Sequence, residues 1–273
     1  MNIQPYQATH SGWTPKLKPW IVHLLAPLRR RYVRRALQVV DIQIRGLEHI
    51  QSVLNEDCGV LIIPNHSSHT DPPVLLEAAG RLKTHLYFMA AWQVFARSNW
   101  LYRQGMRWHG CFSVDREGAD MRAFRQAVEI VQYGRYPLVI FPEGEVYHLN
   151  EQTTPFREGP AVIALTARKH ATRPIKCVPC AMKFSYIQDP TPALLELMER
   201  LERQILWRPR PDMPLADRIY RFAEGILGVK ELEYLGKTQS GLLPERIRLL
   251  AEFVLGNIEK RYAIPSGDTQ IPV

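Results

Sequence analysis

The sequence lacks any long hydrophobic run. No run of about 18 or more apolar residues occurs in its 273 residues, so we predict no transmembrane helix. The apolar patch at residues 20–25 is short, includes His23 and leads into a cluster of arginines, which is not the pattern of a signal peptide. We therefore expect neither a membrane-spanning segment nor a secretory signal in this sequence.

Cysteine is also scarce, and its spacing excludes some site classes. Only Cys177 and Cys180 lie close together, and no second Cys/His pair stands at zinc-site spacing, so we expect no structural zinc. A redox pair needs its first cysteine at a helix start, whereas residues 175–182 have the pattern of an apolar strand. Few, scattered cysteines fit a protein of the reducing cytosol.

Acidic residues are outnumbered by basic ones, 27 to 35, which gives a net charge of +8 and a pI of about 9.4. Such a balance indicates a polyanionic partner, which could be nucleic acid, an anionic membrane surface or an anionic substrate. Helix-turn-helix, zinc and RNP patterns are all missing from the sequence. We therefore expect no nucleic-acid binding.

Residues 15–35 contain seven lysines and arginines and no acidic residue. Their apolar side chains fall on a helical stripe, with a break expected near Pro27. A basic amphipathic segment with a tryptophan is typical of a helix that lies on a membrane surface, and each Lys or Arg near an anionic leaflet contributes roughly 1 kcal/mol. The alternative is a basic helix packed on the body of the protein. The stripe consists of Trp20, Ile21, Leu24, Leu25 and Leu28.

Strand and helix patterns alternate between residues 37 and 188. This alternation predicts an α/β fold with a mostly parallel sheet flanked by helices. The expected helices cover about 72–79, 92–108, 121–131 and 159–170. The expected strands cover about 39–46, 59–63, 84–90, 110–116, 137–141 and 175–184.

The chain from residue 189 to 273 is predicted to be a helical C-terminal extension. Its apolar residues form three helical stripes with a proline-bounded linker between the first two. The stripes indicate packing and not chemistry, so we expect a cap or an oligomer surface. The predicted organisation is therefore a basic membrane-surface segment at 1–36, an α/β domain at 37–188 and the extension at 189–273.

The stretch from Pro64 to Pro72 is the main candidate for a catalytic site. It follows a buried strand and precedes a helix, and in open α/β sheets ligands bind just beyond the carboxyl ends of the strands. Imidazole as a chemical group titrates near neutrality, so a histidine such as His66 can accept a proton from an alcohol. Asp71, five residues later, could orient the ring and stabilise the cation that forms. Asp71 followed by two prolines also suits a helix start, so capping is an alternative role.

Two other types of chemistry are weaker candidates for the same stretch. His66 and His69 stand at a spacing that metal ligands use, but no zincin glutamate follows them. Ser67 or Ser68 as a nucleophile would require a Gly-x-Ser-x-Gly elbow, which is missing. We therefore expect no metal and no protein nucleophile.

Two later strands also end in charged residues. Asp115 and Arg116 close one strand, and the arginine fork matches a phosphate or carboxylate. Glu143 closes another strand, where it could accept hydrogen bonds from acceptor hydroxyls while Gly144 lets a backbone approach closely. Taken alone, each is as well explained by a surface ion pair or a turn.

Together, the blocks resemble the glycerolipid acyltransferases of the 1-acylglycerol-3-phosphate O-acyltransferase family over about residues 37–188. Their order and spacing both match. The matching blocks are Asn65-His66-x-Ser68-x-x-Asp71, Gly110-x-x-x-Val114-Asp115-Arg116, Phe141-Pro142-Glu143-Gly144 and Val178-Pro179.

The resemblance implies an α/β acyltransferase of phospholipid biosynthesis, peripheral to a membrane on its cytoplasmic face. In such an enzyme a lysophospholipid hydroxyl attacks the thioester of acyl-CoA or acyl-acyl carrier protein. His66 would be the base and Asp71 its partner, without a cofactor or metal. The substrate-binding residues implied are Asn65, Ser68, Arg116, Glu143 and Gly144.

The sequence departs from this family in the third block. Members that use glycerol phosphates usually continue with Thr-Arg-Ser after the glycine, whereas residues 145–148 here are Glu-Val-Tyr-His. The usual arginine is missing, so a different lysolipid or an alcohol is an alternative acceptor. Two other functions remain open: a thioester or ester hydrolase that activates water with the same base, and a lipid-binding protein without catalysis.

Overall fold

The computed structural model describes residues 12–116, 118–205 and 208–263. The chain divides into two compact units after Phe184, and each is described here by itself. The first unit contains the sheet, and the second is entirely helical between its loops.

The first unit is built on a five-stranded sheet in which every pairing is parallel. The strand order is β3-β2-β4-β1-β5, so β1 lies between β4 and β5. The predicted mostly parallel sheet is therefore confirmed. Because the strands are parallel, all five carboxyl ends meet at one edge. The strands are β1 (Gly59–Pro64), β2 (Tyr87–Ala91), β3 (Cys111–Val114), β4 (Leu138–Val139) and β5 (Ile175–Cys180).

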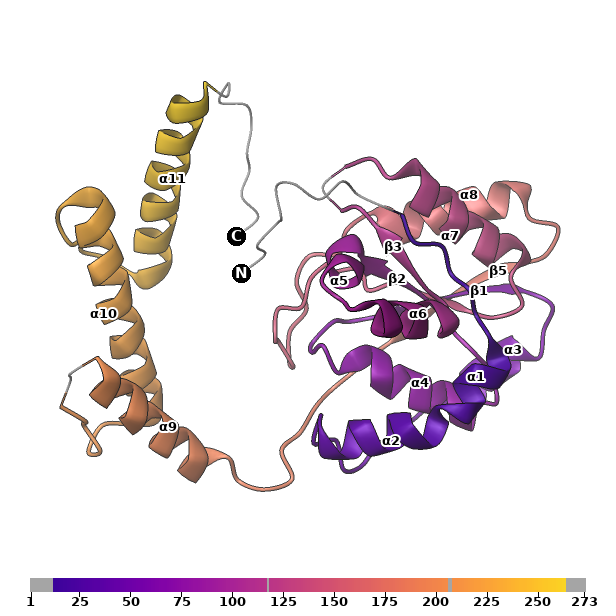
Figure 1. Cartoon of the computed structure of the whole chain (residues 1–273), viewed down its shortest axis with the longest axis horizontal. Helices are drawn as coiled ribbons and strands as arrows, with labels where there is room; N and C mark the ends of the chain where they lie inside the picture. Colours follow the sequence, from indigo (N-terminus) through magenta and orange to yellow (C-terminus); the bar gives the residue numbers. More distant parts are fainter. Residues whose placement is uncertain (1–11, 117, 206–207, 264–273) are drawn as a thin grey trace. The chain divides into compact units, whose positions relative to one another are not determined.

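Helices cover both faces of this sheet (Figure 1). One face carries α3 (Leu47–Leu54) and α4 (Asp71–Arg81), with α1 (Pro19–Leu24) and α2 (Ala26–Arg35) outside α4. The other face carries α7 (Met121–Tyr133) and α8 (Gly159–His170). Two short helices, α5 (Trp92–Ala96) and α6 (Trp100–Trp108), connect β2 to β3, as the sequence predicted.

The central strand β1 supplies side chains to two cores because its residues alternate between the faces. Leu61 packs with Ala127 and Ala167 of α7 and α8, whereas Ile62 packs with residues of α4 such as Leu75. The small residues on α7 and α8 let the helices lie close to the sheet. The closeness is greatest at Gly59, where a Cβ atom would stand 1.9 Å from the backbone oxygen of Val131.

The strand predicted at residues 39–46 is wrong. This segment has no regular secondary structure, and the edges of the sheet are β3 and β5. Ile42 and Ile44 are half-buried while Asp41, Gln43 and Arg45 are exposed. The alternating pattern therefore indicated which side chains face the protein. It did not indicate whether the segment pairs with a neighbouring strand.

The Cys177–Cys180 pair lies on strand β5 and not at a helix start, as the sequence indicated. β5 is an edge strand, which is where a proline such as Pro179 is tolerated. Burial raises the pKa of both thiols, and it raises the pKa of the Cys111 thiol to about 12. These cysteines are therefore protonated thiols near neutral pH and poor candidates for redox chemistry.

The second unit consists of α9 (Thr191–Gln204), α10 (Leu215–Leu235) and α11 (Leu243–Tyr262), which confirms the predicted helical C-terminus. Two buried arginine–carboxylate pairs join the helices. Arg218 binds Glu202 at 3.1 and 2.7 Å, and Arg246 binds Glu231 at 2.9 and 2.8 Å. Paired burial of this kind avoids leaving an uncompensated charge inside the unit.

None of the described helices, in either unit, combines the length and the apolar character that crossing a membrane requires.

Candidate active site

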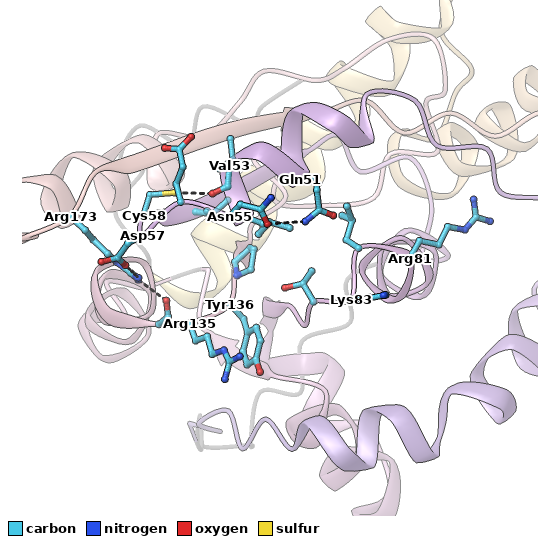
Figure 2. Close-up of a pocket in the computed structure, with 17 residues that line it drawn as sticks. Gln51, Val53, Asn55, Asp57, Cys58, Arg81, Lys83, Arg135, Tyr136 and Arg173 are labelled. Carbon is cyan, nitrogen blue, oxygen red and sulfur yellow. Dashed lines mark hydrogen bonds and ion pairs between the residues drawn. The ribbon is translucent and has the colours of Figure 1, made fainter.

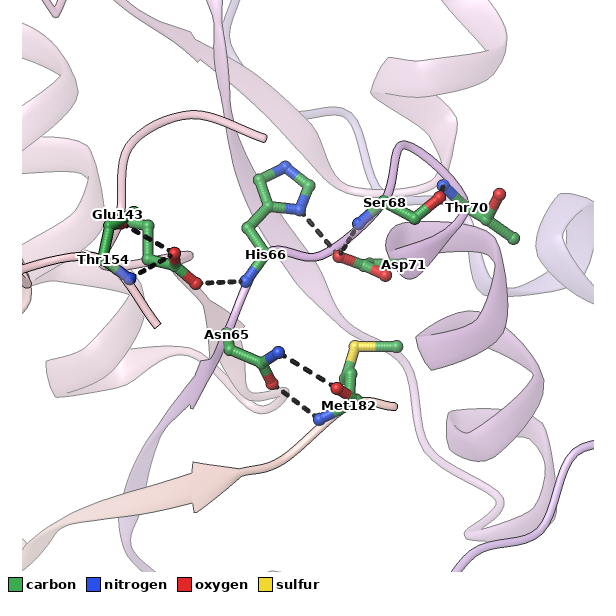
Figure 3. A network of polar contacts seen from close by, with 8 residues as sticks. All are labelled: Asn65, His66, Ser68, Thr70, Asp71, Glu143, Thr154 and Met182. Carbon is green, nitrogen blue, oxygen red and sulfur yellow. Dashed lines mark hydrogen bonds and ion pairs between the residues drawn. The ribbon is translucent and has the colours of Figure 1, made fainter. Parts of the chain in front are cut away.

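The candidate site lies at the carboxyl edge of the sheet, where several strands end together. β1 leads into Asn65 and His66, β3 leads into Arg116, and β4 leads into Glu143 and Gly144. Figure 3 shows the polar network around His66, which joins the segments that follow β1, β4 and β5 through Asn65, Glu143 and Met182. The topology therefore brings together residues that are up to 79 positions apart in the sequence, between Asn65 and Gly144.

His66 and Asp71 are in direct contact. His66 Nδ1 lies 2.8 Å from Asp71 Oδ2, and the aspartate side chain is fully buried while the histidine side chain is 16% exposed. Because an ionised carboxylate can only accept, Nδ1 carries the proton and Nε2 presents its lone pair. This is the geometry of a general base oriented by an acid.

The turn between β1 and α4 explains why Asp71 points at His66. Asp71 is the first residue of α4, and the residue before it, Thr70, makes no side-chain capping bond. The same Asp71 Oδ2 accepts the backbone N–H of Ser68 at 3.0 Å, and Ser68 Oγ accepts the N–H of Thr70 at 3.1 Å. The side chain of Asp71 therefore closes the turn and holds the His66 ring. This role differs from the helix capping that the sequence offered as an alternative for Asp71.

The ring of Phe141 covers one face of the His66 ring. The two ring centroids are 3.9 Å apart and the planes are inclined by 20°. A stacked apolar neighbour fixes the plane of the imidazole and keeps water from that face. Phe141, which precedes Pro142-Glu143, thus helps to position the His66 ring.

Glu143 holds the main chain of the catalytic turn. Its Oε1 accepts the backbone N–H of His66 at 2.7 Å, and its Oε2 accepts the N–H and hydroxyl of Thr154 at 3.0 and 2.7 Å. Burial works to raise the pKa of this carboxyl, but these three hydrogen bonds outweigh it and lower the pKa. Glu143 is therefore a buried carboxylate with both oxygens engaged by the protein.

Asn65 also bonds within the protein. Its side-chain oxygen accepts the N–H of Met182 at 2.6 Å, and its nitrogen donates to the carbonyl of Met182 at 3.0 Å. Asn150 makes the same reciprocal pair with the N–H and carbonyl of Phe184, both at 2.7 Å. Two asparagines from different loops thus pin the chain that follows β5 beside the site.

Arg116 lies against the turn that contains Gly144. Its Nη1 donates to the Gly144 carbonyl, and its Nη2 lies 3.4 Å from Glu145 Oε1. Gly144 has a φ of +78°, which favours glycine, and a Cβ there would meet Arg157 Nε at 2.5 Å. The fold thus brings Arg116 and Gly144, two of the residues predicted to bind substrate, into contact with each other.

This arrangement agrees with a comparison to known families, in which residues 41–183 match the family model described as Acyltransferase. The match covers more than half of the chain. The chain belongs to the acyltransferase family. No curated protein matches the sequence.

The predicted catalytic pair of this acyltransferase is brought together by the fold. Of the five predicted substrate-binding residues, Glu143 bonds to His66, Ser68 bonds to Asp71, and Asn65 precedes His66 in the chain, whereas Arg116 and Gly144 bond to each other. The structure shows bonds to other parts of the protein for Asn65, Ser68, Arg116 and Glu143. Their contact with substrate stays a prediction.

Two further histidines of the acyltransferase lie near His66. His69 and His148 meet edge to face with centroids 5.9 Å apart. Burial, and after it the neighbouring His66 and His148, lower the pKa of His69, so this ring is neutral at physiological pH. Within the described residues no group of three or more His, Cys, Asp or Glu side chains is arranged to hold a metal ion.

A cavity lies elsewhere, at the amino-terminal edge of the sheet (Figure 2). Its volume is about 670 Å³, and its walls include Cys58 and Pro137, which directly precede β1 and β4. Arg173 crosses its rim, bonding Asp57 at 3.3 Å and the carbonyl of Gly134 at 2.6 Å. The cavity contains none of the predicted site residues, so its size does not make it the catalytic site.

Sequence reasoning missed three partners of the site: Thr154, Met182 and the face of Phe141. Thr154 lies in a polar loop with no strand or helix pattern, so nothing local marked it. Met182 acts through its backbone, which the sequence does not reveal. The Phe-Pro-Glu-Gly order was a usable signal for Phe141, because a ring next to a strand end must lie close to His66.

Proposed function

We propose that this acyltransferase moves a fatty acyl group from the thioester of acyl-CoA or acyl-acyl carrier protein to a hydroxyl of a lysolipid. The single observation that carries the proposal is the 2.8 Å contact between His66 Nδ1 and the buried carboxylate of Asp71. It leaves Nε2 as a base that is held in one orientation and one tautomer.

In the proposed reaction, the hydroxyl oxygen forms a C–O bond with the thioester carbonyl carbon. His66 Nε2 takes the hydroxyl proton during the attack, and Asp71 stabilises the imidazolium that results. The C–S bond then breaks, and His66 returns the proton to the departing thiolate. The reaction needs no cofactor, and its products are an ester and a free thiol.

The acceptor is proposed to lie against Arg116 and the turn at Glu143 and Gly144. These residues follow strands that end at the same edge of the sheet as His66, which supports an acceptor bound next to its ring. The resemblance to glycerolipid enzymes makes 1-acylglycerol-3-phosphate, in phospholipid biosynthesis, the first acceptor to test.

We also propose that the enzyme works at the cytoplasmic surface of a membrane, where both lipid substrates dissolve. Trp20, Leu24, Leu28 and Tyr32 are all exposed and recur every four residues along α1 and α2. The opposite side of these helices is tied to the body, because Arg29 and Arg30 both bind Glu77 of α4, at 2.9 and 3.0 Å.

The exposed side continues onto α6, where Trp100, Leu101 and Tyr102 are also exposed. Helix α6 packs against α1, and burial together with the Tyr32 hydroxyl raises the pKa of Tyr102. This surface, the α1–α2–α6 patch, joins aromatic and aliphatic side chains to the arginines of α2. Such a combination is suited to the interface of an anionic leaflet.

The test is an acceptor screen with labelled acyl-CoA and labelled acyl-acyl carrier protein. Lysolipids and lipid alcohols are offered in mixed micelles, and lipid product is measured against free fatty acid. The proposal expects labelled ester with at least one acceptor. Release of free fatty acid alone, with every acceptor, would identify a hydrolase and contradict it.

A further inference from the structure

The guanidinium of Arg116 is already engaged at both of its terminal nitrogens. Nη1 donates to the carbonyl of Gly144, and Nη2 pairs with Glu145 at 3.4 Å. The arginine side chain is only 17% exposed and the glutamate 36%. The edge of the fork that would bind an anionic head group thus faces a carboxylate of the protein.

Other cations compensate little for this pairing. Lys183 pairs with Glu151 at 2.7 Å. Lys169 lies in the last turn of α8, and α8 leads into the amino end of β5. This lysine is therefore near the amino-terminal edge of the sheet, whereas the site is at the carboxyl edge. Arg157 also stands beside Gly144, and it is exposed to solvent.

The wall around Gly144 is therefore close to electrically balanced. It has two cations, Arg116 and Arg157, and two carboxylates, Glu143 and Glu145. A phosphate monoester carries a charge near −2 and binds best where an arginine fork is open. To bind Arg116 it would have to displace Glu145 and then lie beside that carboxylate, and like charges at such a distance repel strongly.

We propose that Glu145 selects against phosphate monoesters, so that the natural acceptor is a hydroxyl-bearing lipid with an uncharged head group. The inference rests on the proposed acyl transfer and narrows its acceptor class. Glu145 acts through Arg116 as a specificity-determining residue, and it takes no part in moving the proton.

The experiment compares two acceptors, 1-monoacylglycerol and 1-acylglycerol-3-phosphate, with the same labelled acyl-CoA in mixed micelles. The measured quantity is the ratio of kcat/KM for the two acceptors. The wild-type enzyme is expected to favour monoacylglycerol. Glu145→Gln should shift the ratio toward the phosphate acceptor by about tenfold or more, because a tenfold change corresponds to roughly 1.4 kcal/mol and like-charge repulsion exceeds that.

Three variants separate this effect from a general disturbance of the loop. Glu129→Gln removes the same charge at an exposed position of α7 and should leave the ratio unchanged. Glu145→Asp keeps the charge and should keep the wild-type preference. In the double variant Glu145→Gln with Arg116→Gln the gain should disappear, because the arginine that Glu145 releases is no longer present.

A wild-type preference for the phosphate acceptor would overturn the inference while leaving acyl transfer established. An equal shift in Glu145→Gln and Glu129→Gln would also overturn it, because the effect would then be one of net charge. Acylation of phosphodiester lysolipids in preference to both acceptors would contradict the uncharged head group. Failure of the wild-type enzyme to acylate any acceptor would overturn the proposed function and this inference together.

Discussion

Glu143 Oε1 accepts a hydrogen bond of 2.7 Å from the backbone N–H of His66. A side chain that follows β4 thus fixes the main chain of the residue that follows β1, on the side of His66 away from Asp71 (Figure 3). The base is held from two directions, by Asp71 through its ring and by Glu143 through its backbone. Such support limits the motion of His66, and even a small misplacement of a reacting group lowers the rate strongly.

We predict that Glu143→Gln lowers kcat by roughly 10- to 100-fold, because small misplacements of a reacting group have effects of this size. The amide nitrogen of glutamine would face a donor, so unfolding free energy should also fall by about 1–3 kcal/mol. Steady-state kinetics and urea unfolding measure the two effects. Thr154→Val, which removes only a hydroxyl partner, should have a smaller effect on kcat. A rise in the KM for acceptor alone would instead support the substrate-binding role that the sequence predicted for Glu143.

The stability of the protein should depend on pH through the ionisation of the Glu143 carboxylate. Because the folded state lowers the pKa of Glu143, its contribution is fully present above the ordinary carboxyl value of 4.5 and is lost as pH falls below it. Urea unfolding of the wild type and Glu143→Gln, from about pH 7 to about pH 3, should show a stability gap that narrows below that value. A gap that is constant across this range would contradict an ionised Glu143.

The two asparagine clamps make a matched pair for mutagenesis. Asn65→Ala and Asn150→Ala each leave a backbone N–H and carbonyl without partners, so each should lower the unfolding free energy by about 1–3 kcal/mol. Only Asn65 adjoins the base, so kcat should fall much further in Asn65→Ala. Equal losses of kcat in the two variants would mean that both act through stability alone.

Membrane binding is predicted to depend on the exposed apolar side of α1 and α2. Replacing Trp20, Leu24 and Leu28 together by serine should reduce binding to anionic liposomes by about tenfold or more, because burial of each such side chain contributes up to about 1.5–3 kcal/mol. Sedimentation with liposomes measures the effect. Leu165→Ser is the control, since Leu165 is equally exposed but lies on α8. Unchanged sedimentation of the triple variant would show that this surface does not bind the membrane.

Much of the fold follows from local pattern. The apolar run before His66 gave β1, and the small residues 161, 164 and 167 gave α8 with its observed limits. Residues 39–46 show where pattern fails, because alternation reports burial and cannot say whether a neighbouring strand exists. Strand order was likewise beyond reach, since it depends on contacts distant in sequence.

The sequence alone could predict those parts of the candidate site in which residue type and position in the chain indicate the same role. His66 and Asp71 lie in one turn, so a five-residue spacing sufficed to pair them. The ion pair between Arg116 and Glu145 joins two loops, and the sequence showed only that an acid stood where the family pattern differs. The bonds from Glu143 to the His66 backbone and to Thr154 needed coordinates, because main-chain donors leave no trace in residue identity.

The central claim is that His66 is the base of acyl transfer. The most direct measurement is the turnover of labelled acyl-CoA to lipid ester by His66→Ala, with circular dichroism to show that it is folded. We predict a loss on the order of 10²–10⁴ in kcat. His49→Ala, at an exposed histidine of α3, should retain wild-type turnover. Near-wild-type turnover by folded His66→Ala would contradict the account.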